Sequence, residues 1–318
     1  MKNILVQLDL EPRHKRKLEA AAPGCVFTYA PGKELTKELV QQADIIIGFP
    51  PAKWIEASPR LELLQLFSAG ADAYVKPGVL DPRTRLTNAT GAYGKAVSEH
   101  AFAATLMLIK KLHRYRDAQR EHAWRDAGPV TSLSDATVLV VGLGDIGLCY
   151  ARMAKALGAR VIGVKRRPGE CPEGVDELCL TADVDRVLPE ADVIFSILPG
   201  TEDTRYFYTR ERFALMKNSA VFVNCGRGTA VETRVLADAL TTGQIAAAAV
   251  DVTEIEPLPA DSPLWDLENL LITPHVAGNF HLPDILERVV DIAAENLDAY
   301  LNGRPLRNVV DFTTGYKK

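Results

Sequence analysis

Cysteines, long apolar runs and a strong net charge are all scarce or absent in this sequence of 318 residues. The five cysteines are scattered, and no pair has the spacing of metal ligands. This argues against a disulfide framework or a bound metal and favours a reduced, cytoplasmic setting. No apolar run approaches the length of a transmembrane helix, so a membrane partner is not expected.

The chain also lacks an excess of charge of one sign. Its formal net charge is −4, with 25% charged and 47% hydrophobic residues, which is typical of a globular protein. Nothing in this balance favours nucleic acid as a partner. Residues 1–9 are expected to form a first strand rather than a signal peptide, because their apolar run is short. The length suggests two domains with sizeable cores.

What the sequence does contain is a glycine motif between a predicted strand (137–141) and a predicted helix (148–157). The spacing Gly-x-Gly-x-x-Gly is formed by Gly142, Gly144 and Gly147. The first glycine allows a tight turn, the second lets the backbone approach a pyrophosphate, and the third lets helix and strand pack closely. The helix N-terminus then presents its N–H groups to the phosphates. The motif therefore predicts a dinucleotide-binding site.

Positive charge follows the next predicted strand, residues 160–164. Proteins that bind NAD usually carry an acidic residue at this position, where it hydrogen-bonds the ribose hydroxyls. This sequence instead has Lys165, Arg166 and Arg167, which can pair with a 2′-phosphate. NADP(H) is therefore the favoured cofactor. NAD(H) is the alternative if the cluster is an ordinary basic surface turn.

Strands and helices alternate along the chain, which predicts an α/β fold with two doubly wound parallel sheets. Before the glycine motif we expect strands at 4–8, 26–29, 44–48 and 63–67 and helices at 12–22, 34–43 and 95–121. After it we expect strands at 192–197, 219–224, 245–251 and 270–273 and helices at 183–188, 233–242 and 282–303.

Four chemically capable side chains follow the last predicted strands. Arg227 lies between two glycines after one strand, Asp251 and Glu256 follow the next, and His275 follows the last. Because the carboxyl ends of parallel strands meet at one edge of a sheet, these residues are expected beside the dinucleotide. Each one alone is more often structural, but the four together favour catalysis.

These residue types suit the reduction of a keto acid. Delivery of a hydride to a keto carbon builds negative charge on the oxygen, which a proton donor must discharge. His275 is suited to this near neutral pH, and a neighbouring Glu256 carboxylate would favour its imidazolium form. Arg227 can clamp a carboxylate through two hydrogen bonds.

Together the motifs resemble those of the D-isomer-specific 2-hydroxyacid dehydrogenases over essentially the whole chain. The matching stretches are Gly-Leu-Gly-Asp-Ile-Gly147, Leu-Pro-x-Thr-x-x-Thr204, Val-Asn-Cys-Gly-Arg-Gly228, Val-Asp-Val-x-x-x-Glu-Pro-Leu-Pro259 and Thr-Pro-His-Val-Ala-Gly278. The resemblance implies reversible, NAD(P)H-dependent reduction of a small 2-keto acid to the D-2-hydroxy acid.

The resemblance also implies roles for single residues. His275 would be the general acid/base, Glu256 would hydrogen-bond it, and Arg227 would hold the substrate carboxylate and keto oxygen. Backbone amides near Ala69 and Gly70 would help to bind the carboxylate. Besides the three glycines and the basic cluster, the cofactor would contact Asp145, Ile146, Pro199, Thr204, Cys225, Gly226, Asp251, His275 and Gly278.

The architecture implied by the resemblance is discontinuous. Residues 1–97 and 278–318 would form a flavodoxin-like substrate-binding domain, and residues 98–277 a Rossmann dinucleotide-binding domain. The helix over 95–121 would help to form a homodimer. The pocket for the substrate side chain is expected among Phe49, Pro50, Tyr93, Trp124 and His281, although surface or interface packing is the favoured role of Trp124.

Other functions stay open at this point. A formate dehydrogenase is disfavoured, because relatives of that type carry Gln in place of Glu256. Residues 90–95 lack the Asn of phosphoglycerate-type members, which weakly disfavours a role in serine biosynthesis. A nucleotide-sensing protein like the C-terminal-binding corepressors keeps the same Arg, Glu and His, so the motifs do not separate it from an enzyme. Glyoxylate and hydroxypyruvate are candidate substrates, and larger keto acids are open.

Overall fold

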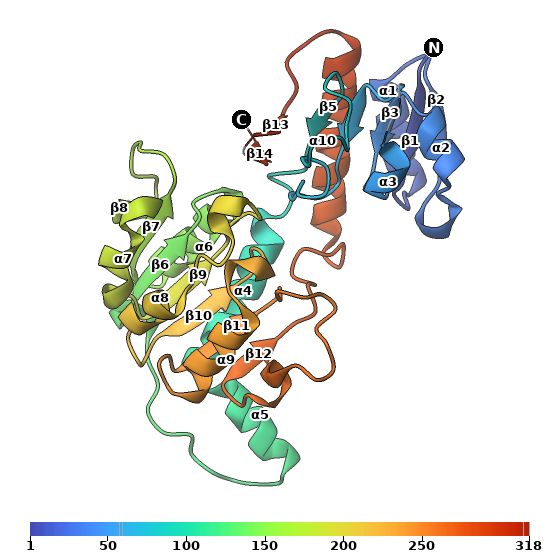
Figure 1. Cartoon of the computed structure of the whole chain (residues 1–318). Coiled ribbons are helices and arrows are strands. Elements are labelled where there is room, and N and C mark those ends of the chain that lie inside the picture. The colour runs from blue at the N-terminus through green and yellow to red at the C-terminus, as the bar shows by residue number, and fades with distance from the viewer. Residues whose placement is uncertain (57, 59, 314, 318) are drawn as a thin grey trace. The chain divides into compact units, whose positions relative to one another are not determined.

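A computed structural model describes residues 1–56, 58, 60–313 and 315–317. The chain divides into two compact units, of which the first combines Met1–Tyr93 with Phe280–Lys318 and the second is Gly94–Asn279. The domain boundaries expected from the sequence lay at 97/98 and 277/278, whereas the units divide after Tyr93 and after Asn279. Both units are drawn in Figure 1.

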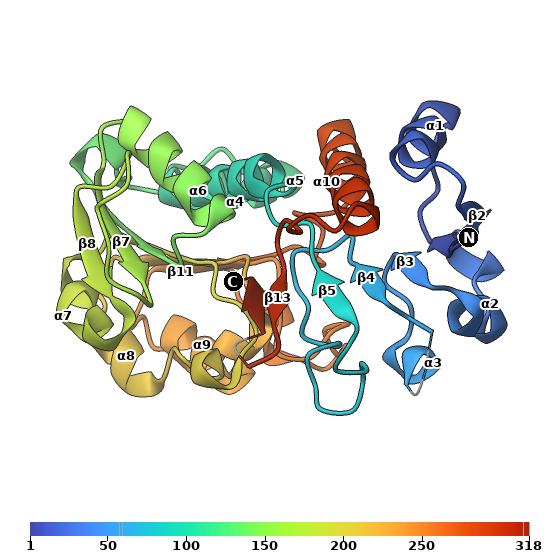
Figure 2. The same cartoon turned by 90° about the horizontal axis from the view of Figure 1, so that it is seen from above.

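The first unit is built on a five-stranded sheet in the order β2-β1-β3-β4-β5, in which every pair is parallel. Its strands are β1 Asn3–Val6, β2 Val26–Tyr29, β3 Ile45–Ile47, β4 Leu63–Gln65 and β5 Arg85–Thr87, and its helices are α1 Pro12–Ala21, α2 Lys37–Gln42, α3 Ala52–Ile55 and α10 Pro283–Leu301. Within this unit α1 and α10 cover one face of the sheet and α2 and α3 the other (Figure 2). This order is that of flavodoxin-like folds, as predicted.

The second unit is built on a seven-stranded parallel sheet in the order β12-β11-β10-β9-β6-β7-β8. Its strands are β6 Thr137–Val141, β7 Arg160–Lys165, β8 Glu177–Leu180, β9 Val193–Ser196, β10 Val221–Asn224, β11 Ala247–Val250 and β12 Leu270–Ile272. Its helices are α4 Gly94–Ile109, α5 Leu112–Arg120, α6 Asp145–Ala156, α7 Val184–Val187, α8 Arg210–Leu215 and α9 Thr233–Thr241. Starting from β6, this is the Rossmann order extended by one strand, so the predicted fold class is confirmed.

Short elements complete the chain. Two-residue strands pair near the C-terminus, β13 Val310–Asp311 with β14 Tyr316–Lys317. The 3₁₀ helices are Gly32–Glu34, Leu133–Asp135, Thr181–Asp183, Leu188–Glu190, Glu202–Thr204, Gly228–Ala230 and Pro263–Asp266. Within the described ranges, none of the helices has both the length and the apolar character that crossing a membrane requires.

The sequence predicted a single helix over 95–121, and this is wrong. Helix α4 ends at Ile109 and α5 begins at Leu112, because Lys111 between them has a left-handed backbone with φ 57°. The Lys111 ammonium donates to the carbonyl of Ala127 at 2.7 Å. This bond ties the break to the loop that returns toward β6. The apolar spacing continues across the break, so periodicity gave no sign of it.

In the two large sheets, the strands β5 and β8 were not expected from the sequence. Each one is the last strand at an edge of its sheet. Arg85 on β5 is exposed, and three of the four residues of β8 are only half-buried. Central strands such as β3, whose Ile45–Ile47 are fully buried, show a continuous apolar run instead.

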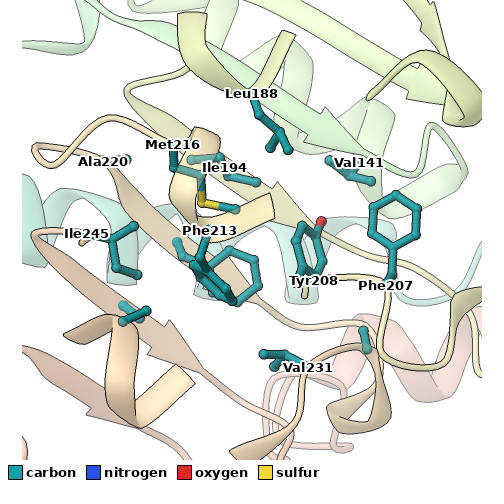
Figure 3. Packing of buried hydrophobic residues seen from close by; sticks show 14 of the residues in the cluster. Val141, Leu188, Ile194, Phe207, Tyr208, Phe213, Met216, Ala220, Val231 and Ile245 are labelled. Carbon is teal, nitrogen blue, oxygen red and sulfur yellow. The ribbon is translucent and has the colours of Figure 1, made fainter. Parts of the chain in front are cut away.

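One core cluster of the second unit is formed by residues of the seven-stranded sheet and of the helices α7, α8 and α9 (Figure 3). Tyr208 and Phe213 each meet the ring of Phe222 on β10 edge-on, with ring centroids 4.8 and 5.4 Å apart. Edge-to-face aromatic pairs of this kind add stability beyond the area that they bury. The cluster therefore fixes β10, the strand whose end carries Arg227.

We predict that Phe213→Ala lowers the free energy of unfolding by about 3–5 kcal/mol, the usual cost of emptying a buried aromatic site. Leu215→Ala is the matched control, because Leu215 lies on the same helix but is exposed. It should change stability by about 0.5 kcal/mol or less. Urea unfolding of the two variants checks this, and equal losses would contradict the assigned packing.

Candidate active site

The glycine motif forms the turn between β6 and α6. Gly142 has φ 110°, and a Cβ there would lie 2.9 Å from the carbonyl oxygen of Ile197. A Cβ on Gly147 would lie 1.9 Å from the carbonyl oxygen of Gly142, so α6 begins directly against the turn. Gly144 is the N-cap and no side chain caps the helix. The first N–H groups of α6 are thus left for a ligand, which fits a dinucleotide pyrophosphate.

Asp145 and Ile146 form the first turn of α6. The Asp145 carboxylate packs against Gly94, where a Cβ would lie 2.6 Å from its Oδ2. This oxygen is buried and has no hydrogen-bond partner among the described residues. The backbone N–H of Asp145, rather than its negative side chain, is therefore the group suited to a phosphate.

The basic cluster lies where β7 ends. Lys165 is the last residue of the strand, and its ammonium donates to the carbonyl of Glu170 at 3.4 Å. Arg166 and Arg167 follow in an exposed turn. In the part of the chain that the structure describes, none of the three forms an ion pair with a carboxylate. Three cations that form no ion pair of this kind fit a 2′-phosphate.

The loop after β9 holds Pro199 and Thr204. The Thr204 hydroxyl donates to the carbonyl of Pro199 at 2.5 Å and accepts from the N–H of Thr201 at 3.0 Å. Thr204 therefore closes its own loop, and this fixes Pro199 at the strand end. A Cβ on Gly226, after the neighbouring strand β10, would lie 2.6 Å from the backbone of Leu198. The two strand ends thus approach each other closely.

Arg227 is held by the tight backbone that its two flanking glycines indicated. A Cβ on Gly228 would lie 1.9 Å from the carbonyl oxygen of Thr253. The buried side chain of Asn224 donates to the carbonyl of Arg227 at 3.0 Å and accepts from the N–H of Gly226 at 3.1 Å. The half-buried guanidinium donates to the carbonyl of Gly226 at 2.9 Å. The backbone around Arg227 is therefore fixed on both sides.

His275 and Glu256 form a hydrogen-bonded pair, as expected from the resemblance. Nδ1 of His275 lies 2.7 Å from Oε2 of Glu256, while Oε1 of Glu256 accepts from the N–H of Thr253 at 3.0 Å. The loop is fixed in turn by Glu254, which accepts from the N–H of Thr233 and the hydroxyl of Tyr206, each at 2.8 Å. With Nδ1 engaged, Nε2 of the exposed imidazole is the atom that can exchange a proton.

Asp251 holds the turn that carries His275. Its carboxylate, 4% exposed, accepts from the hydroxyl of Thr273 at 2.6 Å and from the N–H groups of Val276 and Ala277 at 2.9 and 3.1 Å. Its carbonyl accepts from the N–H of His275 at 2.8 Å. His275 itself has φ 53°, an uncommon conformation for a residue other than glycine. The buried carboxylate thus stabilises a strained backbone at the candidate acid/base.

His100 and Thr273 were not among the site residues expected from the sequence. Nε2 of His100 on α4 lies 3.1 Å from the Thr273 hydroxyl and 3.9 Å from Oδ1 of Asp251. A hydroxyl has one proton, and that of Thr273 is donated to the charged carboxylate, so Nε2 of His100 must donate to Thr273. The bonds therefore run from His100 through Thr273 to Asp251. The signal available in the sequence was a histidine within an otherwise apolar helical repeat.

Cys225 follows β10 beside Asp251. Burial raises the pKa of the Cys225 thiol, and the charge of Asp251 raises it further. The thiol is therefore neutral near physiological pH and is not a nucleophile. Gly278 ends the His275 turn and is half-buried. Among the described residues, no group of three His, Cys, Asp or Glu side chains is placed to hold a metal ion.

Ala69 and Gly70 lie in the first unit, in the loop after β4. Their carbonyls accept from Asn88 Nδ2 at 2.8 Å and Ser68 Oγ at 2.7 Å. The carbonyl of Ser68 accepts from the N–H of Ala89 at 2.9 Å. With the carbonyls engaged, the N–H groups of Ala69 and Gly70 donate to no protein acceptor among the described residues, so they suit a carboxylate ligand.

The five residues expected to line the side-chain pocket are divided between the units. Phe49, Pro50, Tyr93 and His281 belong to the first unit, and Trp124 to the second. Tyr93 is buried, and its hydroxyl donates to the carbonyl of Phe67. Trp124 is fully exposed in the loop after α5, as the expected surface or interface role requires.

Comparisons with known proteins fit this geometry. Residues 102–277 match the family described as D-isomer specific 2-hydroxyacid dehydrogenase, NAD binding domain. The glyoxylate reductase of Korarchaeum cryptofilum is 30% identical over 293 residues, covering 88% of this chain and 86% of that protein.

Two solved structures are similar along nearly their whole length. One is a D-isomer specific 2-hydroxyacid dehydrogenase family protein from Aeromonas salmonicida, with TM-score 0.86, 33% identity and coverage of 98% of this chain and 99% of that one. The other is an NADPH-dependent glyoxylate/hydroxypyruvate reductase from Sinorhizobium meliloti in complex with NADP and sulfate, with TM-score 0.85, 27% identity and coverage of 99% and 100%.

We predict that Thr273→Val lowers the free energy of unfolding by about 1.5–3 kcal/mol, the usual worth of a hydrogen bond to a charged group. Thr273→Ser keeps the hydroxyl and should cost much less. His100→Ala should add little in the Thr273→Val background, because both changes break the same chain of bonds. Urea unfolding of the single and double variants measures this coupling. Strictly additive losses of stability would contradict the chain of hydrogen bonds from His100 through Thr273 to Asp251.

Proposed function

Because the chain belongs to the D-isomer specific 2-hydroxyacid dehydrogenases, oxidoreductases that act on the CH–OH group of 2-hydroxy acids, we propose that it reduces a 2-keto acid with NADPH. The product is the D-2-hydroxy acid, and the reverse reaction uses the same residues. The observation that carries the proposal is the His275–Glu256 pair, with its 2.7 Å hydrogen bond, in the unit that contains the NAD-binding domain.

His275 is the proposed proton donor. The Glu256 carboxylate accepts from Nδ1, which fixes the ring orientation. Nε2 then carries the proton that is given to the keto oxygen, where negative charge develops during reduction. In the reverse direction the neutral imidazole removes the proton of the hydroxyl group.

Substrate binding is assigned to Arg227 and to the N–H groups of Ala69 and Gly70. A guanidinium presents two parallel N–H donors, which match the two oxygens of a carboxylate. Held in this way, the keto carbon is oriented for reduction, which supplies much of the catalytic effect. On this basis the first unit is the substrate-binding domain and the second the dinucleotide-binding domain.

The nicotinamide cofactor belongs on the glycine turn and the strand ends of the second unit. The first N–H groups of α6, from Asp145 to Gly147, would hold the pyrophosphate, and Lys165, Arg166 and Arg167 would hold a 2′-phosphate. Pro199, Thr204, Cys225, Gly226, Asp251, His275 and Gly278 would line the rest of its site. When bound, the cofactor supplies the hydride. The similar proteins from Sinorhizobium meliloti and Xanthobacter autotrophicus were solved with NADP and NADPH, which supports a preference for NADP(H).

The competing functions have no observation that favours them. Glu256 bonded to His275 argues against a formate dehydrogenase, because relatives of that type carry Gln there. A nucleotide-sensing protein would keep the same residues without turnover, so an assay separates the two. The homodimer stays a prediction; the exposed side chains of Leu112, Trp124 and Val130, on and beyond α5, support it.

The central test of the mechanism is His275→Ala. We expect kcat for NADPH-dependent keto-acid reduction to fall by roughly two to four orders of magnitude, the usual contribution of a general acid. The dissociation constant of NADPH is measured alongside, so that a loss of cofactor binding is separated from a loss of proton transfer. His122→Ala is the matched control, because His122 is an exposed histidine of the same unit. Near-normal turnover by His275→Ala would remove this residue from the mechanism.

Cofactor choice is tested by fluorescence titration with NADPH and NADH. The original protein should bind NADPH more tightly, and Lys165→Ala combined with Arg166→Ala should weaken NADPH binding by about tenfold, or about 1.4 kcal/mol, while sparing NADH. Arg234→Ala, at an exposed arginine on α9, serves as the control. Tighter binding of NADH by the original protein would contradict the assignment of the basic cluster.

A further inference from the structure

A row of aromatic rings in the first unit includes Phe49, one of the residues expected to line the side-chain pocket, and two phenylalanines that the sequence did not indicate. The rings of Phe49 and Phe67 have centroids 6.0 Å apart, and those of Phe67 and Phe280 are 5.9 Å apart. Phe49 is 37% exposed, Phe280 is 40% exposed and Phe67 is half-buried. Phenylalanines that contact one another and still face solvent indicate a surface for an apolar group of a ligand.

The place of this row in the sheet points to a ligand site. In the order β2-β1-β3-β4-β5 the direction of winding reverses between β1 and β3, and ligands of such sheets bind beyond the carboxyl ends of the strands at this point. Phe49 follows the end of β3 by two residues, and Phe67 follows the end of the neighbouring strand β4 by two residues. Two of the three rings therefore belong to this edge.

The row is held in place by its surroundings. The N–H of Phe49 donates to Oε1 of Gln7 at 2.7 Å. The buried ring of Tyr74 meets Phe49 edge-on at 5.0 Å, and its hydroxyl donates to the carbonyl of Pro50 at 2.6 Å. The hydroxyl of Tyr93 fixes the carbonyl of Phe67. These bonds fix the loops that carry Phe49 and Phe67, so binding to the row costs little ordering of the protein.

Phe67 and the proposed carboxylate donors share one loop. Phe67 precedes the N–H groups of Ala69 and Gly70 by only two and three residues, and the carbonyls of residues 67–70 are all engaged in hydrogen bonds. A carboxylate bound by these N–H groups therefore lies beside an aromatic surface. This pairing suits an acid whose carboxylate is followed closely by an apolar chain.

We propose, building on the function proposed above, that Phe49, Phe67 and Phe280 form the subsite for the substrate side chain. The preferred substrates are then 2-keto acids with a branched aliphatic or aromatic side chain. Glyoxylate has no side chain to fill the row. Hydroxypyruvate would place a hydroxyl against the rings, where it loses its hydrogen bonds to water.

The experiment measures kcat/KM with NADPH for glyoxylate, hydroxypyruvate, 4-methyl-2-oxopentanoate and phenylpyruvate. We expect at least about a tenfold higher value for one of the last two, since even one well-placed methylene can give that factor. Phe49→Ala and Phe280→Ala should remove most of this advantage. Phe49→Leu keeps an apolar side chain and should retain part of it.

Phe27→Ala is the matched control, because Phe27 lies on the edge strand β2 of the same sheet and stacks on Tyr29 instead of the row. It should leave the order of substrates unchanged. A preference for glyoxylate that the two Phe→Ala variants do not alter would overturn the subsite, while the reductase function would stand.

Binding gives a second measurement that does not depend on turnover. The dissociation constants of (R)-phenyllactate and glycolate are measured by calorimetry on the protein saturated with NADPH, which cannot accept a hydride from either acid. The subsite predicts tighter binding of phenyllactate, lost in Phe49→Ala; tighter binding of glycolate contradicts it. If no keto acid is reduced at all, the proposed function fails, and this measurement still decides the subsite.

Discussion

The buried carboxylate of Asp251 is the constraint on which the candidate site depends. A carboxylate removed from water is costly unless its oxygens are fully hydrogen-bonded. Here it accepts from the Thr273 hydroxyl and from two successive backbone N–H groups. These donors can converge only if the chain turns sharply after β12, and that turn places His275 in its left-handed conformation. The position of His275, the candidate acid/base, thus follows from the hydrogen bonds that the buried Asp251 carboxylate requires.

The same carboxylate joins three parts of the second unit. Asp251 follows β11, the His275 turn follows β12, and His100 reaches Thr273 from α4. Helix α4 also contacts the nucleotide turn, because Gly94 at its start packs against Asp145. One helix therefore contacts both the turn suited to phosphates and the turn suited to proton transfer. A substitution in the N-terminal half of α4 is therefore expected to perturb both turns.

Close backbone approach is the second constraint. At Gly147 and Gly228 an added Cβ would lie 1.9 Å from a carbonyl oxygen, a distance that no side chain tolerates. These glycines let the strand-end loops pack directly on one another. Arg227 and the first turn of α6 consequently lie on rigid backbone, which suits groups that must bind charge without rearranging.

Much of this could be predicted from the sequence, because central strands and glycine turns have local signals. The aliphatic run before Gly142, the buried run at Ile45–Ile47 and the order of motifs up to His275 indicated the fold and the partner of His275. The left-handed residue Lys111 and the edge strands β5 and β8 had no such signal.

Hydrogen bonds and ring contacts between residues far apart in the sequence also could not be predicted from it. His100 and Thr273 are separated by 173 positions, and only folding shows that they meet. The contact of Phe49 with Phe67 and Phe280 is of the same kind, because no periodicity joins three separate loops. Local patterns predict elements and strand ends, whereas hydrogen-bond partners across the fold require coordinates.

The most direct test of the proposed reaction is hydride transfer itself. The protein is incubated with NADPH deuterated at C4 on the transferred face and with a 2-keto acid, and the product is analysed by mass spectrometry and chiral chromatography. The account predicts a D-2-hydroxy acid that carries deuterium at C2. Tight binding of NADPH without any deuterated product, across keto acids of all side-chain sizes, would contradict it and favour a nucleotide-sensing protein.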